Sequence, residues 1–74
     1  MKIQVRLFAT LRAGRFSRDE IDLPEDSSLG DVLAFLNIDR PEAPIRLVNG
    51  RESDWDSPLK AGDCVSLFPG VGGG

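Results

Sequence analysis

The residues best placed to take part in chemistry lie in the last seven positions, FPGVGGG, residues 68–74. Four of the eight glycines of the chain fall within its last five residues. Because glycine has no Cβ, such a segment can enter a channel too narrow for side chains. Fully extended, it reaches roughly 20 Å at about 3.3 Å per residue. It ends in the α-carboxylate of Gly74, which is ionised at neutral pH. The alternative interpretation is a glycine-rich end without a role, since termini are often poorly ordered.

A free carboxylate is a poor acyl donor, because oxide is a very poor leaving group. It has to be activated first, for example as an acyl-adenylate. The sequence contains no P-loop, no GxGxxG after a strand and no GxSxG elbow. We therefore expect the activating enzyme to be a separate partner that uses ATP and Mg. The chain itself is predicted to be no enzyme, to lack a catalytic site of its own and to bind no cofactor.

The remaining reactive side chains point to no second chemistry. The chain has no histidine and one cysteine, which argues against a metal site. Cys64 has no histidine to activate it, and we interpret it as a packing residue on the outer face of a strand. The carboxylates of Asp54 and Asp56 are interpreted as the solvated face of an edge strand, and Trp55 between them as a residue that packs over the core.

Composition limits the partners and the compartment. The formal net charge of −3 argues against nucleic-acid binding. Arg12, Arg15 and Arg18 are close together, and we interpret them as a solvated loop. No apolar run approaches the length of a membrane span, and the N-terminus alternates instead of resembling a signal peptide. We expect a cytoplasmic protein without nucleic-acid or membrane partners.

The elements that must position the tail follow from hydrophobic periodicity. Alternation predicts strands at residues 2–8 and 20–23, joined by a loop around Gly14, and further strands at 45–48, 51–56 and 64–68. Asn49-Gly50 predicts a tight hairpin. An apolar stripe at helical spacing, Leu29, Val32, Leu33 and Leu36, predicts one helix. Ser28 and Asp31 form the expected capping box, and Asn37 the left-handed exit.

This order of elements predicts an α+β fold. A mixed four- to five-stranded sheet packs against one helix as in the ubiquitin-like β-grasp, with the last strand beside the first and Leu59, Val65 and Leu67 in the core. We expect a β-grasp domain at residues 1–69 and a flexible C-terminal Gly-Gly tail at residues 70–74.

Three segments carry a resemblance to a known family: VRLFATLRAG (5–14), LVNGRE (47–52) and PLKAGDCVSLFPGVGGG (58–74). They resemble the MoaD/ThiS family of ubiquitin-like sulfur carriers, and within it the small subunits of molybdopterin synthase. The F-A-x-x-R motif of that subfamily is matched by Phe8, Ala9 and Arg12. Its closing pattern, L-x-x-G-D-x-V-x-x-F-P-P-V-x-G-G, is matched at Leu59, Gly62, Asp63, Val65, Phe68, Pro69, Val71, Gly73 and Gly74. Two positions depart from it: Gly70 replaces the second proline, and Gly72 extends the terminal pair to three glycines.

The resemblance implies that a ubiquitin-activating-type enzyme adenylates Gly74, and that a persulfide sulfur then converts it to a C-terminal thiocarboxylate. Gly73 and Gly74 would act in sulfur transfer, while Val71 and Gly72 thread the partner's channel. In molybdopterin synthase, part of molybdenum cofactor biosynthesis, the tail would insert into the large subunit. The open alternatives are a thiamine-pathway or other sulfur carrier that serves another sulfur-accepting enzyme, a ubiquitin-like protein modifier, and a non-covalent binding module.

Docking is expected to use the sheet as well as the tail. Phe8 and Phe68 are out of phase with the inward residues of their strands. If the two strands are neighbours, the aromatics meet near the tail. One interpretation is an exposed patch for partner binding that continues into Pro69 and Gly70. The other is that both aromatics cap the end of the core.

Overall fold

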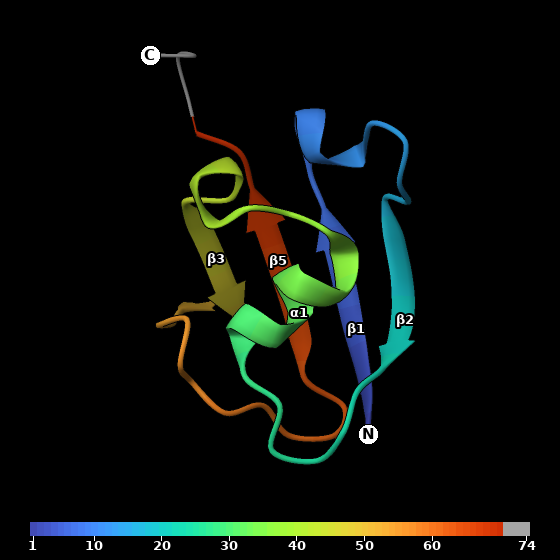
Figure 1. Cartoon of the computed structure of the whole chain (residues 1–74), viewed down its shortest axis with the longest axis vertical. Coiled ribbons are helices and arrows are strands. Elements are labelled where there is room, and N and C mark those ends of the chain that lie inside the picture. The colour runs from blue at the N-terminus through green and yellow to red at the C-terminus, as the bar shows by residue number, and fades with distance from the viewer. Residues whose placement is uncertain (71–74) are drawn as a thin grey trace.

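The computed structural model of the chain describes residues 1–70. Within them a five-stranded mixed sheet has the order β2-β1-β5-β3-β4, and one α-helix crosses one of its faces (Figure 1). The strands are β1 (Lys2–Leu7), β2 (Arg18–Asp22), β3 (Ile45–Val48), β4 (Arg51–Glu52) and β5 (Cys64–Phe68), and the helix is α1 (Leu29–Leu36). Two 3-10 turns, η1 (Ala9–Arg12) and η2 (Arg40–Glu42), complete the elements. The predicted α+β class and β-grasp arrangement are confirmed.

The first and last strands form the centre of the sheet. β1 and β5 run parallel, with Val5 beside Val65 and Leu7 beside Leu67. All four of these side chains are buried. β2 pairs with the outer side of β1, and β3 with the outer side of β5, both antiparallel. The remaining strand, β4, returns from β3 through Asn49 and Gly50, whose φ angles of 52° and 83° confirm the predicted hairpin turn.

The helix supplies the other half of the core. Leu29, Val32 and Leu33 are buried against the sheet, whereas Leu36, at the end of the predicted stripe, is only half-buried. Leu59 enters the same core from the loop before β5, as predicted. Fully burying an aliphatic side chain of this size stabilises a fold by about 1.5–3 kcal/mol. The apolar face of the sheet is therefore covered by α1, and the opposite face is left open.

Both ends of α1 are satisfied by specific side chains. The backbone N–H of Ser28 donates to Asp31 Oδ2 at 2.8 Å, and the N–H of Asp31 donates to Ser28 Oγ at 3.4 Å, which confirms the capping box. Asn37 ends the helix in the left-handed conformation, at φ 57° and ψ 42°. The guanidinium of Arg15 donates to the carbonyls of Leu36 and Asn37 at 3.5 and 3.3 Å. Arg15 is thus exposed in its loop, as predicted, and is also bonded to the helix end. Arg18, which was expected in the same loop, instead begins β2, so that part of the interpretation is wrong.

The strand predicted at residues 51–56 is also wrong in length, because β4 ends at Glu52. Beyond it the chain leaves the sheet and approaches α1, where the carbonyl of Trp55 accepts the N–H of Gly30 at 2.8 Å. The indole packs against the core, as predicted. The guanidinium carbons of Arg40 and Arg46 lie 5.4 and 4.3 Å from its ring centroid. The chain around Trp55 therefore bonds to the start of α1, and β4 does not continue its pairing with β3 beyond Glu52.

No helix among residues 1–70 is long and apolar enough to cross a bilayer.

Replacing Gly30 with alanine is expected to destabilise the fold, although helix propensity alone predicts a gain of about 1 kcal/mol. A Cβ at this position would lie 3.3 Å from the Trp55 carbonyl oxygen and 3.2 Å from Arg40 Nη2, so the loop has to move. We expect a loss of about 1 kcal/mol or more in the free energy of unfolding, measured by urea denaturation. Gly70→Ala is the matched control, because its Cβ would meet only Pro44 Cγ, at 3.5 Å. A more stable Gly30→Ala variant would contradict the packing argument.

Candidate docking site at the tail end of the sheet

The predicted site residues fall into two groups. Phe8, Phe68, Pro69 and Gly70 lie within the described part of the chain. The remaining predicted residues, Val71, Gly72, Gly73 and Gly74, lie outside the described residues, so their roles stay predictions. In Figure 1 the C-terminal end of β5 and the turn η1 lie at the same end of the sheet, opposite the N-terminus. The tail therefore starts beside the residues that follow β1.

Phe8 and Phe68 are brought together by the parallel pairing of β1 and β5. Leu7 and Leu67 are neighbours in register and point into the core, so the next residue of each strand turns to the open face. The N–H of Phe8 donates to the Leu67 carbonyl at 3.2 Å. The two rings stack with centroids 4.2 Å apart and an interplanar angle of 10°. The predicted meeting of the aromatics is confirmed.

Ile45 extends this pair across β5. It is directly opposite Phe68 in the antiparallel register, so the two side chains share the open face. Ile45 is 38% exposed, and Phe8 and Phe68 are half-buried. Among the described residues, the core cluster includes none of the three. We call Phe8, Phe68 and Ile45 the aromatic patch; its position favours an exposed surface over a cap on the core.

The sharp turn after Phe8 isolates the patch at the end of β1. Ala9, the residue that makes this turn, has a positive φ of 52°. The left-handed region costs a residue with a Cβ roughly 1–2 kcal/mol. The turn leads into η1, which is anchored in the core by Leu11. Phe8, the extended residue directly after β1, is thus the last one on the open face before the turn.

The base of the tail continues from the patch. Pro69 is half-buried and Gly70 is exposed. A Cβ at Gly70 would meet Pro44 Cγ at 3.5 Å, an ordinary van der Waals contact, and Gly70 is not among the glycines with positive φ. Neither space nor backbone conformation requires glycine here. The departure from the proline of the family pattern is therefore not imposed by the fold.

Other reactive groups do not converge on this region. Cys64 is half-buried, and its backbone N–H donates to Asn49 Oδ1 at 2.9 Å, just beyond the last residue pair of β3 and β5. Within residues 1–70 no group of three histidine, cysteine, aspartate or glutamate side chains could hold a metal ion. The described residues thus offer a candidate docking surface and the root of the predicted tail.

Comparisons with known proteins agree with this geometry. A structure described as a putative molybdopterin converting factor, subunit 1, from Pyrococcus furiosus is 31% identical, with a TM-score of 0.77 over 96% of this chain and 99% of that one. The small archaeal modifier protein 1 of H. volcanii is 25% identical, with a TM-score of 0.77 over 95% and 98% of the two chains. A comparison with curated protein sequences finds no significant match.

A third structure contains a partner. It is a protein–protein complex of subunits 1 and 2 of the molybdopterin-converting factor from Helicobacter pylori. The matching chain is 26% identical, with a TM-score of 0.68 over the full length of both chains. The family model described as the ThiS family matches residues 5–74, which include the aromatic patch and the whole predicted tail. The chain therefore belongs to the ThiS family of small ubiquitin-like carrier proteins.

Proposed function

We propose that this chain is a sulfur carrier whose C-terminal Gly74 is converted to a thiocarboxylate, and that it serves as the small subunit of molybdopterin synthase. The observation that carries the proposal is the family match through Gly74, together with a fold neighbour that occurs in complex with subunit 2 of the molybdopterin-converting factor. The aromatic patch at the root of the tail supports it, because an exposed apolar surface of this kind is typical of protein docking sites.

The proposed chemistry begins on a partner enzyme. A carboxylate oxygen of Gly74 attacks the α-phosphorus of ATP, whose charge Mg offsets, and pyrophosphate leaves. The terminal sulfur of a persulfide then attacks the carbonyl carbon of the acyl-adenylate, and AMP leaves. A thiol cleaves the S–S bond of the resulting acyl disulfide, which leaves the thiocarboxylate and a new disulfide. The sulfur of the thiocarboxylate is a far better nucleophile than the original carboxylate oxygen.

The chain's own contribution is binding and reach. In the proposed complex the aromatic patch docks on the large subunit and places the root of the tail at the mouth of its channel. Val71 and Gly72 then thread this channel, and Gly73 and Gly74 bring the terminal sulfur inward. The glycines fit a narrow channel because they lack side chains. The sulfur acceptor would be the pyranopterin precursor held by the large subunit. We place the protein in the cytoplasm, where these enzymes and ATP would be available.

A second candidate function is protein modification. The likeness to a small archaeal modifier protein favours it, because an adenylated C-terminus can also form an isopeptide bond with a lysine. Both functions share the activation step and differ in the group that attacks the acyl carbon. A sulfur carrier for thiamine or another pathway would share the thiocarboxylate and differ in its acceptor.

Intact mass distinguishes these functions. After incubation with an activating enzyme, ATP, Mg and a persulfide donor, we expect a mass gain equal to the exchange of one oxygen for sulfur. Ligation to other proteins instead would support the modifier. Deleting Gly74 is expected to abolish the mass gain and to leave the melting temperature unchanged, because the core lies within residues 3–67. A chain left unmodified by several activating enzymes would contradict the carrier and favour a non-covalent binding module.

Charge on the aromatic patch is expected to weaken docking. Phe8→Glu removes the ring stacked on Phe68 and places a carboxylate in a surface that has to be desolvated. We expect at least a tenfold loss of affinity for the large subunit, about 1.4 kcal/mol, by calorimetry. Phe35→Glu is the matched control, because Phe35 is 55% exposed and lies on α1, away from the open face. Equal affinity of the Phe8→Glu and wild-type chains would exclude the patch from the interface.

Restoring proline at Gly70 is expected to tighten that complex. Proline fixes φ and lowers the conformational freedom that the root of the tail loses on binding, by about 0.4–1 kcal/mol, or roughly two- to fivefold in affinity. Gly70→Ala, which fits the available space, separates the effect of proline from that of an added Cβ. Weaker binding of Gly70→Pro at unchanged melting temperature would mean that the partner requires the freedom of glycine, and would favour a different acceptor.

A further inference from the structure

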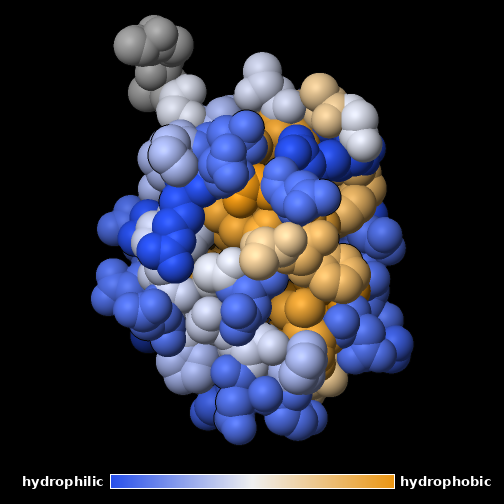
Figure 2. Space-filling model, viewed as in Figure 1, coloured by the Kyte–Doolittle hydropathy of each residue, from blue (hydrophilic) through white to orange (hydrophobic). Residues whose placement is uncertain are grey.

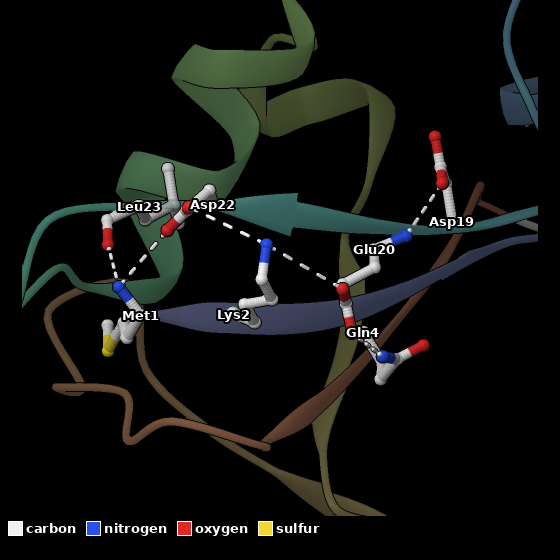
Figure 3. A network of polar contacts seen from close by, with 7 residues as sticks. All are labelled: Met1, Lys2, Gln4, Asp19, Glu20, Asp22 and Leu23. Carbon is white, nitrogen blue, oxygen red and sulfur yellow. Dashed lines mark hydrogen bonds and ion pairs between the residues drawn. The ribbon is translucent and has the colours of Figure 1, made fainter.

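The open face of the sheet has an uneven distribution of charge along the β1–β2 ladder. At the N-terminal end of β1, positions that face each other carry complementary groups. Lys2 Nζ lies 3.7 Å from Asp22 and 3.9 Å from Glu20, and Gln4 Nε2 donates to Glu20 at 2.7 Å (Figure 3). The N-terminal ammonium of Met1 lies 3.2 Å from Asp22 Oδ1. These cations lower the pKa of Asp22, chiefly through the hydrogen bond from the ammonium.

The other end of the same ladder carries two like charges. Arg6 and Arg18 are directly opposite each other in the antiparallel register. Side chains so placed have Cβ atoms about 4.5–5.5 Å apart, and like charges there destabilise the sheet. Within residues 1–70, neither guanidinium has a carboxylate within 4.0 Å, and both side chains are exposed. Two cations therefore stand together on a chain whose net charge is −3.

These arginines adjoin the aromatic patch. The guanidinium carbon of Arg6 lies 5.5 Å from the ring centroid of Phe8, which is stacked on Phe68. On β5, Ser66 is the neighbour of Arg6 and Leu67 the neighbour of Leu7. Arg6 therefore precedes Phe8 by two residues, and the two are adjacent on the open face. The cations thus border the surface through which, in the proposed function, the large subunit receives the tail. The repulsion between Arg6 and Arg18, which destabilises the free protein, thus lies at the edge of the proposed docking surface.

We propose that Arg6 and Arg18 bind carboxylate side chains of the large subunit, at the rim of the channel that receives the tail. This inference rests on the proposed function, and it further predicts that the partner's surface is negatively charged where it meets the two arginines. Carboxylates there would remove the repulsion between the two guanidiniums and accept their hydrogen bonds, and Arg6 is already oriented by Phe8. Rim charges of this kind act mainly on the association rate and on the choice of partner.

The test measures association with the purified large subunit of molybdopterin synthase from the same organism. Arg6→Glu and Arg18→Glu are each expected to slow association about tenfold or more at low salt, and the difference from wild type should shrink as salt screens the charges. Arg51→Glu is the matched control. It makes the same change of charge at an exposed arginine of β4 that is opposite Val48, on the face that α1 covers. It should associate like the wild type.

A second variant separates docking from folding. Arg18→Gln removes the repulsion with Arg6, so we expect it to raise the melting temperature and yet to slow association. Glutamate variants that associate like the wild type at low salt would overturn the inference. So would a loss of the same size in Arg51→Glu. If the wild-type chain gains sulfur but does not bind the large subunit, the carrier function stands and this inference falls. If the wild-type chain neither gains sulfur nor binds the large subunit, both the carrier function and this inference are contradicted.

Discussion

The parallel contact between β1 and β5 is the interaction on which the rest of the structure depends. It joins the two ends of the described chain at the centre of the sheet, and each of the two strands then carries one antiparallel neighbour. The same register that buries Leu7 beside Leu67 turns Phe8 and Phe68 to the open face and stacks them. A shift of one residue would send the leucines to solvent and the aromatics to the core, so the core and the proposed docking surface are specified together.

The division of labour between the two faces follows from the size of the domain. In residues 1–70 of this 74-residue chain, one α-helix covers one face of the sheet. The covered face, made of aliphatic side chains from both layers, provides the stability. The open face is free to carry polar and aromatic groups. Its end at Lys2 is charge-balanced (Figure 3), and its end at Arg6 and Phe8 is cationic and aromatic. The helix side shows apolar surface between hydrophilic side chains in Figure 2.

Much of the fold could be predicted because its signals are local. Alternation placed β3 and β5 at the residues where they occur, and the capping box and the Asn49-Gly50 turn depend on neighbours within a few positions. Long-range competition explains what was missed. Trp55 lies outside the sheet, and its carbonyl accepts a hydrogen bond from Gly30 in α1. Arg15 donates to carbonyls at the end of α1, more than twenty residues away in the sequence. For the site, periodicity predicted that Phe8 and Phe68 face outward, but Ile45 and the Arg6–Arg18 pair depend on strand register, which a single sequence does not state.

The central pairing also ties recognition to the folded state. Val5 and Val65 are sixty positions apart, and closing so long a loop is the slow, entropically costly step of such a topology. Until it closes, Phe8 and Phe68 are separate, and a collapsed or damaged chain carries the same glycines without the surface beside them. An enzyme that reads the stacked rings before it accepts the tail would therefore act as a quality check. Its substrate would be the native conformation, and misfolded copies with an intact terminus would be passed over.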